Sequence, residues 1–277
     1  MGLNVSAAQK ASRLDSTAEN GQAFQVDNIG LMVDQTTILK DVTLTFPKGE
    51  LVALVGHNGS GKSSLLKILA RQQPATSGSA RYAGQELSTF EDRAFARSVA
   101  YLAQDIGTGA DMTVRELVSC GRYPWHGALG RFTDLDRAKV DEALALTHIE
   151  AFSDRMVGTL SGGERQRAWI AMLVAQDSQC LLLDEPTAAL DIAHQMEVLS
   201  LVRKLSHEKG LSVIIVLHDI NMAARFCDRI HALKGGQVVA SGSPHQLVQR
   251  DTLRQIYGID MDVVPHPGLS VPLAYVC

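Results

Sequence analysis

Short, predominantly apolar runs alternate along this chain with longer segments that mix apolar and polar positions. Four of these runs have the length of buried strands, namely residues 51–55, 99–103, 180–183 and 211–217. Between them, residues 64–70 and 193–209 carry apolar positions at the spacing of a helix face. Residues 230–240 turn at two glycines and predict a hairpin. Strands that alternate with helices form a parallel sheet, so the pattern predicts an α/β fold.

The same pattern divides the chain into regions. Residues 1–22 are rich in Ser, Ala, Gln and Asn without a sustained period, so we expect a mobile arm there. The regions expected after it are a main domain at 23–243, with an α/β core at 23–104 and 165–243 and a helical subdomain at 105–164, and a C-terminal extension at 244–277.

Helix-start signals dominate the inserted region. Thr113 with Glu116 forms a capping box, and Thr133 precedes a helical run at 134–147. Between them lies an aromatic segment that contains Tyr123 and Trp125. Two interpretations of these rings stay open, because they can pack locally or, if exposed, form a docking surface.

Composition and charge narrow the class of protein. The chain has 277 residues, of which 45% are hydrophobic and 20% charged, as in an ordinary globular protein. A net charge of −4 gives no basic surface for nucleic acid, so no nucleic-acid partner is expected. The longest apolar runs are strand-sized, far below the ~20 residues that cross a bilayer. The N-terminus lacks the continuous apolar run of a secretory signal.

Cysteine spacing points to a reducing compartment. The four cysteines lie far apart and show neither a C-x-x-C pair nor a zinc-binding spacing. We therefore expect a cytosolic setting, with Cys180 and Cys227 filling the core.

The phosphate-binding pattern G-x-x-x-x-G-K-[ST] occupies residues 56–63, between a predicted strand and a predicted helix. Glycines let the backbone approach a phosphate closely, and the helix N-terminus adds positive charge at the same place. Lys62 is expected to reach the β- and γ-phosphates, and the Ser63 hydroxyl to ligate Mg²⁺. The residues expected around the nucleotide are Gly56, His57, Asn58, Gly59, Ser60, Gly61, Lys62, Ser63 and Ser64. This segment predicts binding of a nucleoside triphosphate.

Two carboxylates, Asp184 and Glu185, end the apolar run 180–183. In open α/β sheets ligands bind beyond the carboxyl ends of the strands, which is where this pair falls. Asp184 is placed to hold Mg²⁺, and Glu185 to polarise an attacking water as a general base. Such a pair is weak evidence alone, and its weight comes from the phosphate loop in the same chain.

A second anion site is predicted at residues 160–166. Ser161 and Glu164 form a capping box, so a helix begins here, and Gly162 and Gly163 leave its N-terminus uncovered. One γ-phosphate cannot easily contact both this site and the phosphate loop of one chain. The economical arrangement is a head-to-tail dimer, in which each nucleotide lies between one phosphate loop and the partner's residues 161–163.

The segment L-S-G-G-E-R-Q at 160–166 resembles the signature of the ATP-binding cassette ATPases, and the resemblance extends from about Phe24 onward. It implies a P-loop NTPase fold with a RecA-like core, an N-terminal antiparallel β-subdomain and an inserted helical subdomain that carries the signature. It also implies ATP and Mg²⁺ as the bound groups.

Further roles come from this resemblance alone. Gln104 falls at the Q-loop position, which contacts the metal and the γ-phosphate site and links them to the transporter. Asp191 falls at the D-loop position in the dimer interface, and His218 at the switch histidine that contacts the γ-phosphate. A lone histidine at a strand end is more often structural, but the order His218-Asp219 favours the switch role.

Three positions depart from the family pattern. Val33 stands where an aromatic residue often stacks on adenine, so the adenine contact is weaker or is supplied elsewhere. Ala188 replaces a serine before the D-loop and removes a hydroxyl. Ser64 replaces threonine, a mild change.

Within this family, residues 121–132, 174–178 and 190–195 resemble bacterial ferric hydroxamate import ATPases. The resemblance implies two copies docked on a membrane permease, at the cytoplasmic face of the inner membrane, with a periplasmic siderophore-binding protein as an indirect partner. Import of haem, vitamin B12 or a catecholate siderophore stays an alternative. A soluble cassette protein of translation or DNA repair is less favoured, because the chain has one cassette, no heptad insertion and an acidic balance.

Overall fold

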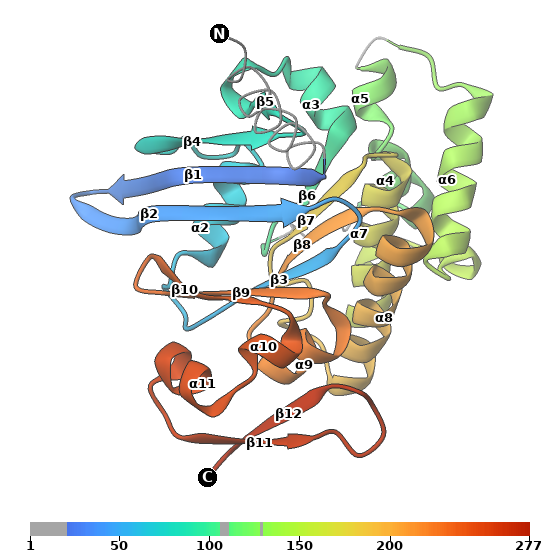
Figure 1. Cartoon of the computed structure of the whole chain (residues 1–277). Coiled ribbons are helices and arrows are strands. Elements are labelled where there is room, and N and C mark those ends of the chain that lie inside the picture. The colour runs from blue at the N-terminus through green and yellow to red at the C-terminus, as the bar shows by residue number, and fades with distance from the viewer. Residues whose placement is uncertain (1–20, 106–110, 128–129) are drawn as a thin grey trace, which may run out of the picture.

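The computed structural model of this chain describes residues 21–105, 111–127 and 130–277. Figure 1 shows a central sheet with antiparallel strands on one side, a group of helices on the other, and a small hairpin at the C-terminal end. The arm expected at residues 1–22 lies almost wholly outside the described residues, and the first strand, β1, begins at Gln22.

The central sheet has six strands in the order β10-β9-β3-β8-β7-β6. Strands β3, β8, β7 and β6 are parallel and coincide with the four apolar runs, which confirms the α/β prediction. Strand β9 is parallel to β3 and turns into antiparallel β10, as the predicted hairpin requires. The bounds are β3 Leu51–Val55, β6 Val99–Leu102, β7 Cys180–Leu183, β8 Ser212–Val216, β9 Arg229–Lys234 and β10 Gln237–Gly242.

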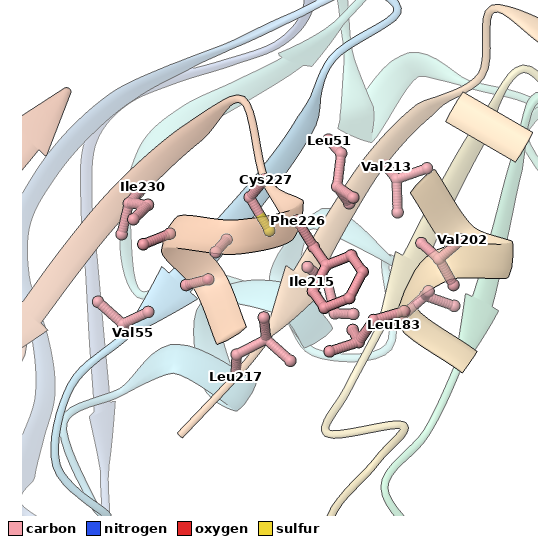
Figure 2. Close-up of a cluster of buried hydrophobic side chains, with 14 of the residues drawn as sticks. Leu51, Val55, Leu183, Val202, Val213, Ile215, Leu217, Phe226, Cys227 and Ile230 are labelled. Atoms are coloured by element: carbon pink, nitrogen blue, oxygen red, sulfur yellow. The ribbon is translucent and has the colours of Figure 1, made fainter. Parts of the chain in front are cut away.

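Strand β3 is apolar at every position because both of its faces are covered. Leu51 and Ala53 point into a core with helices α7, α8 and α9, whereas Val52 and Leu54 pack toward helix α2. Helix α2 spans Lys62–Leu69, α7 Gly162–Ala175, α8 Ile192–Lys209 and α9 Ile220–Phe226. Figure 2 shows the first of these cores, where the Phe226 ring lies among side chains of β7, β8 and α8. The thiols of Cys180 and Cys227 are free and buried, as expected.

The N-terminal strands form a separate antiparallel sheet in the order β2-β1-β4-β5, which confirms the expected β-subdomain. In β2, Val42, Leu44 and Phe46 are buried and alternate with exposed Thr43 and Thr45, so one face is apolar. This face closes over α2 and the second face of the central sheet. The bounds are β1 Gln22–Val33, β2 Thr36–Pro47, β4 Ser77–Tyr82 and β5 Gln85–Glu86.

The helical region packs around a third core. The predicted capping box at Thr113 is present and begins α4, and Thr133 caps the predicted helical run α6 through a capping box with Asp136 that is not among the sequence-based predictions. Buried alanines of α7 pack with these helices, so the third core continues past residue 164 to Ala175. The helices here are α4 Val114–Cys120, α5 Tyr123–His126 and α6 Asp134–Leu146, with short 3-10 turns at Glu150–Phe152 and Val157–Thr159.

The aromatic segment divides between the two interpretations. The Trp125 ring lies between the guanidinium groups of Arg97 and Arg122, each 5.0 Å from the ring, and its Nε1 donates to the Gln176 carbonyl at 2.7 Å. Arg97 belongs to helix α3 (Asp92–Ser98), so the tryptophan ties the core to the helical region. Tyr123 is 57% exposed and remains available for contacts with another molecule.

The C-terminal extension is folded onto the core. It contains helices α10 (Pro244–Leu247) and α11 (Arg250–Tyr257), followed by a hairpin of β11 (Met261–Pro265) and β12 (Pro272–Val276). These elements lie beside α9 (Figure 1). Across the three described stretches, the search for a helix both long and apolar enough to cross a membrane found none.

Candidate nucleotide-binding site

The phosphate loop connects β3 to α2 and needs its glycines. Gly56 has φ 139°, and a Cβ there would lie 2.0 Å from the Leu233 carbonyl oxygen. Gly61 has φ 97°, and a Cβ would lie 2.5 Å from the Leu39 side chain. Gly61 is also the N-cap of α2 and has no side chain to cap the helix, which leaves its first N–H groups for an anion.

Lys62 is held inside this loop. Its Nζ donates to the main-chain carbonyls of Gly56 at 2.8 Å and His57 at 2.9 Å. Burial lowers the pKa of the ammonium, while the nearby charges of Glu185 and Asp184 oppose that shift. An ammonium has three N–H donors, so the two carbonyls leave one for a phosphate oxygen.

Asp184 and Ser63 meet at the end of β7. The Ser63 hydroxyl donates to Asp184 Oδ1 at 2.7 Å, and Oδ2 is buried with no partner among the described residues. Burial raises the pKa of the Asp184 carboxyl, which the Ser63 hydrogen bond partly offsets. A buried carboxylate oxygen without a partner, next to a hydroxyl, fits a hard cation such as Mg²⁺, which uses one or two protein ligands and the phosphates of its substrate.

Glu185 is fixed by two donors from neighbouring strands. Gln104 Nε2 lies 2.7 Å from Glu185 Oε2, and His218 Nε2 lies 2.7 Å from the same oxygen. Gln104 follows β6, Glu185 follows β7 and His218 follows β8, so the parallel sheet brings three strand ends together. The Glu185 side chain is only 10% exposed, and its backbone has φ 50°.

These groups surround one cavity of about 380 Å³. Its wall combines the phosphate loop with the three strand-end side chains, as the sequence predicts. The lining residues are Ile38, Asn58, Gly59, Ser60, Gly61, Lys62, Ser63, Ser64, Gln104, Glu185 and His218.

The predicted second anion site lies apart from this cavity. Ser161 caps α7, and both hydrogen bonds of the Ser161–Glu164 capping box are present. Gly162 is exposed as expected, but Gly163 is buried beneath the His194 ring. A Cβ added to Gly163 would lie 2.2 Å from that ring. The expectation of an uncovered N-terminus is therefore correct for Gly162 and wrong for Gly163.

Asp191 is engaged locally. Its Oδ1 accepts from the His194 N–H at 2.9 Å, which caps α8, and its Oδ2 lies 2.8 Å from His194 Nδ1. The His194 ring that covers Gly163 is thus held by Asp191 of the same chain.

Sequence reasoning missed three features of the site. Ile38 lines the cavity from β2, although no motif marks it. His57 Nε2 turns toward the main chain of Tyr257, 200 residues away. His194 covers Gly163, and the only sequence signal for this contact is that His194 follows Asp191 by three residues. Val33 is 41% exposed at the end of β1, so the structure does not provide the missing aromatic ring there.

The site combines a phosphate loop that holds a buried lysine, an aspartate hydrogen-bonded to the loop serine, and a glutamate held by two neighbours. This combination defines a P-loop nucleoside triphosphatase. The family model described as "ABC transporter" matches residues 39–188. The chain belongs to this family of ATP-binding cassette proteins, and it binds and hydrolyses ATP.

Curated relatives match most of the chain. The ferric enterobactin transport ATP-binding protein FepC of Escherichia coli (strain K12) is 40% identical over 237 residues, which are 86% of this chain and 88% of that relative. The iron(3+)-hydroxamate import ATP-binding protein FhuC of Bacillus subtilis (strain 168) is 37% identical over 251 residues, 91% of this chain and 93% of that relative.

Solved structures agree on the fold. An ABC transporter in an inward-facing conformation matches with a TM-score of 0.80 at 23% identity, over 92% of this chain and 98% of that one. The dimeric structure of MJ0796, a bacterial ABC transporter cassette, matches with a TM-score of 0.69 at 29% identity, over 79% of this chain and 98% of that one. The predicted P-loop NTPase architecture is confirmed.

Proposed function

We propose that this chain is the ATP-hydrolysing subunit of a bacterial importer for iron(III)-hydroxamate siderophores. Two copies act as peripheral subunits on the cytoplasmic face of the inner membrane. The observation that carries the hydrolytic role is the Glu185 carboxylate, held by Gln104 and His218 on the wall of the phosphate cavity. The substrate assignment rests on the FhuC relative and on the resemblance at residues 121–132.

Phosphate binding follows from the loop geometry. The N–H groups at the start of α2 converge on the cavity, and the third N–H of Lys62 reaches a phosphate oxygen. The Gly56 and His57 carbonyls keep the ammonium in place, so little reorganisation is needed when the nucleotide enters.

The donors around Asp184 suit Mg²⁺. Ser63 and Asp184 would hold the ion, and the Gln104 amide oxygen is a third candidate ligand. When bound, the ion neutralises charge on the β- and γ-phosphates. The unpaired Asp184 Oδ2 supports this assignment.

Hydrolysis needs a base beside the terminal phosphate. Glu185 accepts the proton of the attacking water, and a positioned base of this kind contributes about 10²–10⁴ in rate. Gln104 and His218 keep the carboxylate in position. His218 also lines the cavity and can contact the γ-phosphate.

A second copy completes the site. The cavity wall in the described chain contains no residue of the signature segment, whose Ser161 and Gly162 are exposed at the N-terminus of α7. In a head-to-tail pair, Ser161, Gly162, Gly163 and Glu164 of one copy approach the nucleotide of the other, with Asp191 at the interface. The dimeric MJ0796 cassette supports this arrangement.

The permease partner is proposed to dock in an apolar groove of about 450 Å³ between α3, β6 and α7. Ala96, Trp169 and Met172 line it, and so does Ala103, the neighbour of Gln104. A permease helix seated there would touch the segment that holds Glu185. Substrate would reach the permease from a periplasmic siderophore-binding protein.

The substrate has one specific competitor, because FepC is a ferric enterobactin transport protein and is 40% identical. A strain that lacks this chain can be grown with ferrichrome or ferric enterobactin as sole iron source. Growth on ferrichrome should need the wild-type chain and should not be restored by Glu185→Gln. A growth defect on ferric enterobactin alone would change the assigned substrate to a catecholate siderophore. Normal growth of the deletion strain on both iron sources would overturn the proposal.

A further inference from the structure

The C-terminal extension contacts the phosphate loop through His57, which is not among the residues that line the nucleotide cavity. His57 Nε2 donates to the main-chain carbonyl of Tyr257, the last residue of α11, at 2.9 Å. The two rings also meet edge to face, with centroids 5.6 Å apart. The carbonyl of His57 accepts from Lys62, so the same residue links α11 to the ammonium of the site.

A second contact reaches the segment behind His218. Asn221, in the first turn of α9, donates from Nδ2 to the Ala274 carbonyl at 2.9 Å, and its Oδ1 accepts from the Ala274 N–H at 2.8 Å. This reciprocal pair fixes β12 against α9. Only Asp219 and Ile220 separate Asn221 from His218, and Asp219 caps α9 by accepting from the Asn221 N–H.

Tyr257, the partner of His57 in the first contact, also lies near the second. It lines a shallow apolar hollow of about 300 Å³ together with His218, Asn221 and Ala274. Its hydroxyl is buried without a partner among the described residues, and burial, followed by the charge of Asp219, raises the pKa of this phenol to about 12. Tyr257 thus contacts the phosphate loop through His57 and lines the same hollow as His218.

We propose that residues 250–277 form a brace that positions the two halves of the nucleotide site: Tyr257 holds the phosphate loop through His57, and Ala274 holds the His218 segment through Asn221. This inference rests on the proposed role of His218. The two contacts act on different steps, because the phosphate loop binds ATP whereas His218 orients Glu185 for hydrolysis. His57 and Asn221 are therefore positioning residues with separable effects.

Steady-state hydrolysis by the full-length protein tests the brace. His57→Phe keeps a ring against Tyr257 and removes the hydrogen bond, so KM for ATP should rise about threefold to tenfold with kcat unchanged. Asn221→Leu keeps the side-chain volume and removes the reciprocal pair, so kcat should fall about threefold to tenfold with KM unchanged. Asn221→Asp retains the acceptor for the Ala274 N–H but sets a carboxylate oxygen against the Ala274 carbonyl, so it should lower kcat as well.

Lys234→Met is the matched control. Lys234 Nζ donates to the Gln255 carbonyl of α11 at 2.6 Å, a similar bond to the same helix outside the site. We expect all three variants, Lys234→Met, His57→Phe and Asn221→Leu, to lower Tm. Lys234→Met should leave KM and kcat unchanged. If His57→Phe and Asn221→Leu also lower Tm without changing KM or kcat, the brace is refuted.

A failure of the proposed import function can be distinguished from a failure of the brace. Wild-type protein that imports no siderophore refutes that function, whereas the brace is judged by ratios between variants. The affinity of each variant for a fluorescent ATP analogue, measured on a Glu185→Gln background, decides the His57 contact without hydrolysis. Equal affinities of His57→Phe and wild type in that assay would overturn it.

Discussion

His218 and Gln104 reach the same oxygen of Glu185, each at 2.7 Å. The two side chains extend from β8 and β6, the strands on either side of β7, which carries Glu185. The glutamate is thus fixed from both sides by the order of the strands. A small shift between these strands would move this carboxylate, which is the base of the proposed mechanism.

Glu185→Gln is expected to abolish turnover while ATP binding persists. The amide keeps the shape of the side chain but cannot take a proton, so kcat should fall by about 10²–10⁴. With hydrolysis blocked, MgATP should trap a dimer, which analytical ultracentrifugation can detect. Near-normal hydrolysis by this variant would refute the base assignment, and a strictly monomeric variant in MgATP would refute the shared site.

The buried pair of Arg122 and Asp136 should make the helical region sensitive to acid. Their side chains are 3% and 5% exposed, with Nε to Oδ1 at 2.9 Å. Burial alone would raise the pKa of Asp136, but hydrogen bonds from Thr133 and Arg122 lower it to about 2. Because this is below the ~3.9 of an unfolded aspartate, the pair stabilises the fold above about pH 4 and loses its contribution as the pH falls toward 2.

Asp136→Asn should therefore cost about 3–5 kcal/mol at neutral pH, since it leaves a buried guanidinium without its carboxylate. Urea unfolding between pH 3 and pH 7 measures the cost, which should shrink below about pH 4. Asp141→Asn, at the exposed pair with Arg115, is the control and should change stability by about 0–1 kcal/mol. Equal effects of the two variants would show that the buried pair has no special role.

The contact between Gly163 and His194 predicts a rescue. Gly163→Ala should push a methyl group into the His194 ring, which should cost about 1–3 kcal/mol of stability, displace residues 161–164 and so lower ATPase activity. Addition of His194→Ala should restore most of that activity. A double variant as inactive as Gly163→Ala would mean that the nucleotide, and not the histidine, requires this glycine.

Two substitutions in helix α3 test whether the permease docks in the proposed groove. Ala96→Glu places a charge in the groove, whereas Ala94→Glu places it on the exposed face of α3. We expect Ala96→Glu to lose co-purification with membranes and to hydrolyse ATP normally in isolation. Ala94→Glu should retain both properties. Membrane association by both variants would exclude the groove as the docking site.

The sequence determines the sheet and the phosphate site because their signals are local. The four apolar runs become parallel strands, and each capping box begins a helix at its predicted residue. The strand-end rule predicts the place of Asp184 and Glu185, whereas the roles expected for Gln104 and His218 rest on the family resemblance. The strand and helix signals are short-range patterns combined with one topological rule.

The remaining features depend on contacts between distant segments without a local period. His57 meets Tyr257 only because α11 folds back over the phosphate loop, and the covering of Gly163 depends on the angle between α7 and α8. The sequence predicts residues 244–277 only as an extension, since the prolines in this segment indicate turns and do not show which strands pair.

The left-handed backbone of Glu185 has a consequence for the stability of the protein. A side chain at φ 50° costs about 1 kcal/mol relative to glycine, and Asp184 adds a second negative charge beside it. Glu185→Gly should therefore relieve this strain, but it also removes the contacts of Oε2 with Gln104 and His218, so its urea midpoint should exceed that of Glu185→Gln by no more than the strain allows. The strained backbone at this position contributes nothing to stability, which fits a residue kept for its carboxylate.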